Sequence, residues 1–174
     1  MHRTRALVTA AVATLVVAGT VVAADAASAS DHDSDGRSGC RYGAGPVGTW
    51  NETVDPVGPP PPFVSLVQFH SDGTMVDAVS STPLNPALAP LHPDGATSGL
   101  GSWTRDGDSF RFAFERFITS GGVNVIDQRI EGTMTVASDC MSTQGTAHVT
   151  FTRASDHSVL AQADVVTGGT RLMP

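Results

Sequence analysis

The sequence predicts an all-β protein whose domain, residues 47–174, folds as an eight-stranded antiparallel up-and-down barrel. Apolar and polar residues alternate over short segments, as they do in strands with one buried face. Tight-turn pairs such as Asp72-Gly73 and Asp106-Gly107 separate these segments. No helical i, i+3, i+4, i+7 pattern continues for three turns within the domain. A barrel is favoured over a sandwich because closure removes exposed sheet edges.

The first four strands are expected at residues 47–54, 63–70, 74–80 and 100–104. Gln68 and Asp77 could each fall on the apolar phase of their strands. Segment 56–62 holds five prolines and must leave the sheet, because proline cannot donate to a strand ladder. Segment 81–98 also contains several prolines, and it predicts a long loop over the mouth of the barrel.

The last four strands are expected at residues 109–118, 123–136, 145–153 and 158–167. Phe110, Phe112 and Phe114 alternate with polar or small residues and mark one apolar face. In the next strand Ile126, Ile130, Met134 and Val136 share a face with Gln128, whereas Val123 and Val125 fall out of phase. We therefore expect a bulge near Val125. Val159, Ala161, Ala163 and Val165 are expected to share the apolar face of the last strand.

The N-terminal residues have the pattern of a secretory signal peptide, predicted over residues 1–26. Arg3 and Arg5 precede an uncharged apolar run, and small residues then offer cleavage after Ala26 or Ala29. A polar linker, residues 27–46, follows. This predicts a secreted protein, extracellular or in the cell envelope, that keeps no membrane span after cleavage.

Two cysteines, Cys40 and Cys140, are expected to form a disulfide in an oxidising compartment. Residues 31–36 match the opening of a calcium loop, but its last ligand position is Tyr42, so no metal site is expected. The histidines are scattered, and no cofactor is predicted. The formal net charge of −7 argues against nucleic acid as a partner, because nucleic-acid binding needs basic patches. The oligomeric state is not indicated.

Gly48-Thr49-Trp50 resembles the G-x-W motif at the first strand of lipocalin-like barrels, the calycin superfamily. Arg171 resembles the arginine that packs across that tryptophan in those barrels. The resemblance implies a cation–π contact between Trp50 and Arg171 that closes one end of the barrel. The chain departs from the family in two respects: the T-D-Y motif and a C-terminal helix are not evident.

The resemblance implies binding of one small apolar or amphipathic molecule inside the barrel. The expected lining residues are Trp103, Phe110, Phe112, Phe114, Gln128 and Ile130. A binding protein is favoured over an enzyme, since no motif such as G-x-S-x-G is present. Two alternatives stay open: a cyclase or isomerase that uses the same cavity, and a protein-interaction module whose barrel is filled. A filled interior would exclude both cavity functions. An open apolar cavity without convergent polar groups favours binding, and a cavity with a buried acid or histidine opposite an apolar wall favours catalysis.

Overall fold

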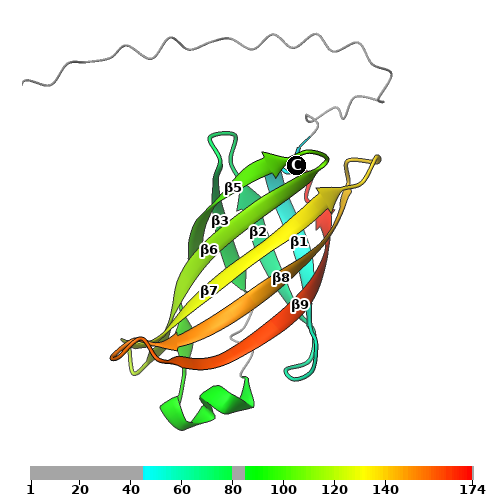
Figure 1. The fold of residues 1–174 in the computed structure, drawn as a ribbon. Helices are drawn as coiled ribbons and strands as arrows, with labels where there is room; N and C mark the ends of the chain where they lie inside the picture. The colour runs from blue at the N-terminus through cyan, green and yellow to red at the C-terminus, as the bar shows by residue number, and fades with distance from the viewer. Residues whose placement is uncertain (1–44, 80–84, 174) are drawn as a thin grey trace, which may run out of the picture. The chain divides into compact units, whose positions relative to one another are not determined.

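The computed structural model describes residues 45–79 and 85–173 of the 174-residue chain, and they form a closed antiparallel β-barrel (Figure 1). The strands are β1 Gly48–Pro56, β2 Phe63–Phe69, β3 Thr74–Val79, β4 Gly95–Ala96, β5 Gly99–Asp106, β6 Ser109–Ser120, β7 Val123–Val136, β8 Ser142–Arg153 and β9 Val159–Arg171. A short 3-10 helix, η1 Pro86–Leu91, precedes the two-residue strand β4. The signal peptide, nearly all of the linker, and Cys40 with its predicted disulfide lie outside the described residues.

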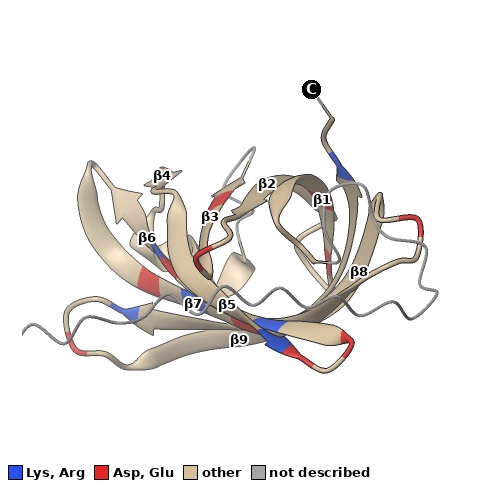
Figure 2. Ribbon diagram, turned by 90° about the horizontal axis from the view of Figure 1, so that it is seen from above, with Lys and Arg blue, Asp and Glu red and all other residues tan. Residues whose placement is uncertain are grey.

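Eight strands make the barrel wall, in the order β6-β5-β3-β2-β1-β9-β8-β7, and pairing of β6 with β7 closes it. Viewed from above, the strands form a ring (Figure 2). Apart from the β1–β9 pair, neighbours in the wall also follow one another as wall strands along the chain, so the topology is up-and-down. The predicted fold class is therefore confirmed. Within the described part of the chain, no helix is long and apolar enough to cross a membrane.

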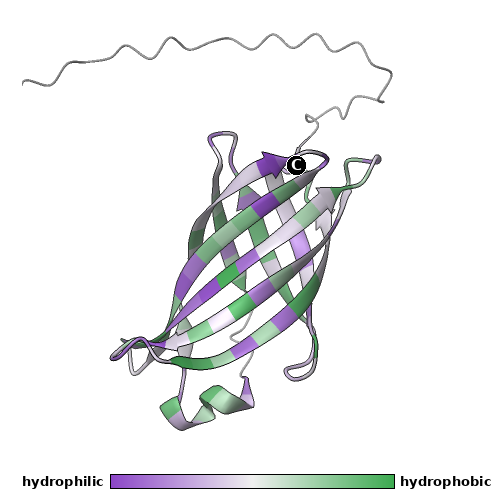
Figure 3. Ribbon diagram, in the orientation of Figure 1, coloured by the Kyte–Doolittle hydropathy of each residue, from purple (hydrophilic) through white to green (hydrophobic). Residues whose placement is uncertain are grey.

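Alternation along the strands builds the core, as the hydropathy colouring of Figure 3 shows. On β6, Phe110, Phe114 and Ile118 are buried, whereas Arg111, Glu115 and Phe117 are exposed. Asp77 also points inward, at 3 % exposure. Gln68 is exposed, so its inward placement was wrong: β2 buries Ser65, Val67 and Phe69 on the opposite phase.

Two irregularities in the ladder adjust which side chains face the core. Ile118 pairs with Ile126 and Thr119 with Asn124, so Val125 is the extra residue of a bulge, as predicted. A second shift near Phe151 leaves Leu160 without a partner between Ala161 and Val159. Val159 is 61 % exposed in consequence, and its predicted place on the apolar face was wrong.

One end of the barrel is closed by Trp50 and Arg171, which pair across β1 and β9. The Arg171 guanidinium carbon lies 4.2 Å from the centroid of the Trp50 ring, the contact that the lipocalin resemblance implied. Trp50 is fully buried, and its indole Nε1 donates a hydrogen bond of 2.6 Å to the Pro46 carbonyl. Arg171 also donates to the backbone carbonyls of Gly45, Val47 and Cys140.

Gly48 is required at this closed end for two reasons. Its φ of +131° is one that residues with a Cβ rarely adopt. A Cβ added there would lie 2.6 Å from Arg171 Nη1, which is too close for the guanidinium to stay over the Trp50 ring. The glycine of Gly48-Thr49-Trp50 thus makes room for the arginine.

The segment before β4 covers the opposite end, below the barrel in Figure 1. Asn85 caps η1 by accepting a hydrogen bond of 3.0 Å from the Ala87 amide. Leu88 of η1 is 1 % exposed and belongs to the barrel core. Within the expected loop, residues 86–91 thus form a helical turn that places a leucine in the barrel core.

Candidate functional site

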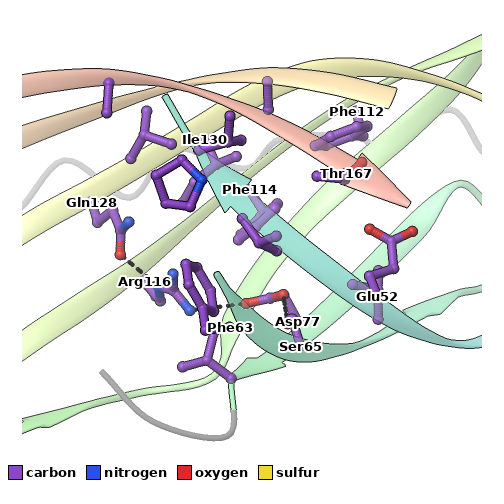
Figure 4. Close-up of a pocket in the computed structure, with 18 of the residues that line it drawn as sticks. Glu52, Phe63, Ser65, Asp77, Phe112, Phe114, Arg116, Gln128, Ile130 and Thr167 are labelled. Carbon is purple, nitrogen blue, oxygen red and sulfur yellow. Dashed lines mark hydrogen bonds and ion pairs between the residues drawn. The ribbon is translucent and has the colours of Figure 1, made fainter. Parts of the chain in front are cut away.

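A cavity of about 80 Å³ lies inside the barrel between its two ends (Figure 4). Most of the side chains that line it are apolar, among them Val54, Val67, Phe112, Phe114, Ile130, Val149, Phe151, Ala163 and Val165. Liquid water occupies about 30 Å³ per molecule, so the space suits a small organic group or a few waters. The barrel interior is therefore mainly apolar and incompletely filled.

Five buried polar side chains line the same cavity, and we call them the polar belt. They come from five strands of the wall: Glu52 of β1, Ser65 of β2, Asp77 of β3, Arg116 of β6 and Gln128 of β7. Their exposed fractions lie between 2 % and 7 %. Buried ionisable groups cost free energy unless they are paired and hydrogen-bonded, so their partners decide what the belt can do.

Four members of the polar belt form one hydrogen-bonded chain (Figure 4). Arg116 Nη1 donates to Asp77 Oδ2 at 3.1 Å, and this contact is also an ion pair. Arg116 Nε donates to Gln128 Oε1 at 2.6 Å, and the Ser65 hydroxyl donates to Asp77 Oδ1. Asp77 therefore accepts from two neighbours, and Arg116 is fixed at two of its three nitrogens.

The hydrogen-bonded chain passes over the inner face of β5, because β5 lies between β3 and β6 in the wall. Gly99 of β5 lies at this point. Gly99 pairs with Asp77 and has no side chain to fill the inner face. A Cβ there would lie 2.6 Å from the Phe114 ring and 3.2 Å from the Asp77 Cβ. The glycine thus leaves room for Asp77 and Arg116 to meet across a strand.

Burial acts on both charged members of this pair. It raises the pKa of Asp77, an effect that the Arg116 charge and the Ser65 hydroxyl oppose. It lowers the pKa of Arg116, an effect that the Asp77 charge opposes. The two hydrogen bonds that Asp77 accepts stabilise its ionised form, so the pair contributes no net charge to the cavity.

Of the two acidic residues in the belt, Glu52 is the one with no cation beside it. Its nearest hydrogen-bond partner is the Thr143 hydroxyl, at a long 3.4 Å. Burial, and to a smaller extent the charge of Asp77, raises the pKa of Glu52 from its ordinary 4.5 to about 7. A carboxyl group with that pKa can both accept and donate a proton near neutral pH.

Gly169 of β9 makes room for Glu52. The two residues pair across β1 and β9. A Cβ at position 169 would lie 2.9 Å from Glu52 Cγ and 2.5 Å from the Thr143 hydroxyl oxygen. Any larger residue at position 169 would displace the Glu52 carboxyl or the Thr143 hydroxyl. The glycine is therefore needed for Glu52 to occupy this position.

The structure brings four of the six expected lining residues to the cavity: Phe112, Phe114, Gln128 and Ile130. Trp103 and Phe110 do not line it. They pack against each other and Phe69, with ring centroids 5.7 Å and 6.3 Å from the Trp103 ring. The Trp103 and Phe110 rings therefore fill the barrel instead of bounding its open space, whereas Phe69 also lines the cavity.

Three members of the polar belt were not predicted as site residues from the sequence: Glu52, Ser65 and Arg116. The signal was present in the strand phase: Arg116 lies two residues beyond Phe114, and Glu52 two residues beyond Trp50. A charged residue on the inward phase of a strand was the signal that would have predicted these site residues.

Among the described residues, no three histidine, cysteine, aspartate or glutamate side chains converge in a way that could hold a metal ion. His148 instead contacts Asp164 on the outer face, with Nδ1 2.8 Å from Oδ1. Comparison of the chain with protein-family models, with curated proteins and with solved structures gave no match.

Proposed function

We propose that this protein binds a small, partly apolar molecule inside its barrel, as lipocalin-like barrels do. The observation that carries the proposal is the cavity, where apolar walls meet the buried polar belt. Apolar residues in place of a buried ion pair are often neutral or stabilising, so folding alone does not account for these polar groups. The predicted signal peptide places this binding outside the cytoplasm in our proposal. A filled barrel that recognises proteins is less well supported, because the interior retains open space.

Filling the cavity tests this function. Ala163 lines the cavity, and we expect Ala163→Leu to occupy most of the space and to abolish ligand binding while the barrel still folds. The measurement is native mass spectrometry of protein secreted by its own host, which detects a co-purifying small molecule as added mass. Ala78→Leu is the matched control, because Ala78 is exposed on the outer face. Equal ligand occupancy in both variants would place the ligand elsewhere and reject the proposal.

A second candidate function, proton-transfer catalysis of the isomerase kind, is favoured by one observation. Glu52 lines an apolar cavity without a cationic partner, and its pKa is about 7, the value that suits a general base near neutral pH. In such a reaction the Glu52 carboxylate takes a proton from a carbon beside a carbonyl. The C–H electron pair forms a C=C bond as the C=O π pair moves onto the oxygen, and Glu52 then returns the proton to a carbon of this enolate.

Deuterium exchange tests this second function without knowledge of the natural substrate. In D₂O we expect the protein to exchange the α-hydrogens of cyclopentanone, at a rate that rises with pH through about 7 as Glu52 ionises. Glu52→Gln is expected to lower the protein-dependent rate by about 100-fold, the usual scale of a lost general base. Proton NMR follows the loss of the α-hydrogen signal. An unchanged rate in Glu52→Gln would remove the catalytic role.

A further inference from the structure

We propose that the cavity selects an uncharged molecule that carries a carbonyl-type oxygen, and that Arg116 and Gln128 hold this oxygen. This inference rests on the proposed binding function and names the class of ligand. It follows from three properties of the described residues: the free donors of the polar belt, its charge, and the size of the apolar space.

The free donors of the belt belong to Arg116 and Gln128. Arg116 uses Nε and Nη1 for Gln128 and Asp77, and Gln128 uses its oxygen for Arg116. Among the described residues, nothing accepts a hydrogen bond from Arg116 Nη2 or Gln128 Nε2. Neither atom is among the fully buried polar atoms that lack a partner, which are Asn124 Oδ1 and Arg153 Nε. Since both side chains line the cavity, these N–H groups face its open space.

Donors from two side chains that pair across β6 and β7 suit one oxygen that accepts two hydrogen bonds. A carbonyl oxygen has two lone pairs and meets this requirement. Arg116 and Gln128 come from neighbouring strands and are already fixed to each other by the 2.6 Å hydrogen bond. The donors are therefore held in place before the ligand arrives, which lowers the entropic cost of binding.

The charge of the cavity argues against an anionic ligand. Its charged lining groups are Arg116, Asp77 and Glu52. Arg116 is already neutralised by Asp77, and Glu52 adds either no charge or one negative charge. A carboxylate ligand would lose its hydration without meeting an unpaired cation. An ammonium group has no acceptor, so a cationic ligand would leave the N–H groups of Arg116 and Gln128 without a partner.

The apolar walls and the small volume of the cavity determine the size and polarity of the rest of the ligand. Phe112, Phe114 and Ile130 line the same space from β6 and β7, the strands that carry the donors, and the cavity measures about 80 Å³. This is well below the roughly 300–1,000 Å³ of pockets for drug-sized ligands. A compact hydrocarbon body with one carbonyl group fits both the walls and the donors.

Three probes of similar shape and different charge test the selection on the unaltered protein. Cyclopentanone, cyclopentanecarboxylate and cyclopentylammonium are titrated, and binding is followed in ¹⁵N NMR spectra by the side-chain amide signal of Gln128. We expect cyclopentanone to move this signal and to bind at least about tenfold more tightly than either charged probe, the scale of one well-formed hydrogen bond to a charged donor. Tighter binding of the carboxylate or the ammonium overturns the inference but leaves an interior binding site in place.

Gln128→Glu tests the donor directly, because it keeps the oxygen that accepts from Arg116 and removes the amide donor. We expect about tenfold weaker cyclopentanone binding in this variant. Gln162→Glu is the matched control, since Gln162 is exposed on β9, and it should leave the affinity unchanged. Equal affinity in both variants rejects the role of Gln128. Failure of all three probes to bind rejects the proposed function, and with it this inference.

Discussion

Replacing Arg116 by methionine is expected to lower the free energy of unfolding by about 3–5 kcal/mol at neutral pH, the usual cost of removing one member of a buried ion pair. Methionine keeps most of the apolar volume but leaves the Asp77 carboxylate buried without its cation. Arg116 and Asp77 side chains are only 5 % and 4 % exposed, so bulk solvent does little to screen the unpaired charge. Urea denaturation followed by far-ultraviolet circular dichroism measures the change.

Arg111→Met is the matched control on the same strand. Arg111 also pairs with an aspartate, Asp106, at 2.7 Å, but the two side chains are 69 % and 50 % exposed. Exposed ion pairs contribute about 1 kcal/mol or less, so this variant should remain close to the unaltered protein. If Arg116→Met cost no more than Arg111→Met, the buried pair would not have the energetic role described here.

Acidification should reverse part of the loss in Arg116→Met. Burial raises the pKa of Asp77, and without Arg116 nothing cationic opposes that effect. A raised pKa in the folded state means that stability falls as pH rises through it. The deficit of the variant should therefore shrink as pH falls toward about 4, where Asp77 of the unfolded chain also binds a proton.

The strands were predictable because their signal is local. Period-2 alternation places Phe110, Phe112 and Phe114 on one face without knowledge of any neighbouring strand. The out-of-phase Val125 likewise indicated its own bulge. Leu160 gave no such signal, because its bulge arises where β9 meets β8 and depends on the register between two strands. Val159 was consequently placed on the wrong face.

The polar belt was only partly predictable, because the pairing of its side chains depends on residues that lie far apart in the sequence. The inward phase of Asp77 and Gln128 could be read from their own strands. The pairing of Asp77 with Arg116 could not, since the two residues lie 39 positions apart and meet only because Gly99 leaves space on β5. Local sequence thus shows that a polar residue faces the core, whereas barrel register decides which partner it meets.

Glu52 illustrates what an unpaired inward carboxyl does to the whole barrel. It shares the inner face of β1 with Trp50, and its nearest partner is a hydroxyl at 3.4 Å. Its pKa of about 7 exceeds the ordinary 4.5 that it regains on unfolding. Between these values the folded state binds more protons than the unfolded state, so the stability of the barrel falls as pH rises from about 4.5 to about 7.

Glu52→Gln should remove this pH dependence, because glutamine is neutral at every pH and has nearly the same shape. A pKa difference of this size corresponds to about 3 kcal/mol. At pH 8 the variant should therefore be about 3 kcal/mol more stable than the unaltered protein, and at pH 4 the two should be nearly equal. Urea denaturation at a series of pH values measures both limits.

The exposed carboxylate of Glu115 supplies the control, since Glu115→Gln should retain the fall in stability between pH 4.5 and 7 that Glu52 causes. A Glu52→Gln variant that was less stable at pH 8 would mean that the ionised carboxylate is stabilised by a group other than Thr143. Gain of stability on loss of the charge is instead the behaviour of a residue kept for function, because a carboxyl that weakens the fold above pH 7 has no structural reason to be there. The stability measurement thus bears on the proton-transfer role independently of any substrate.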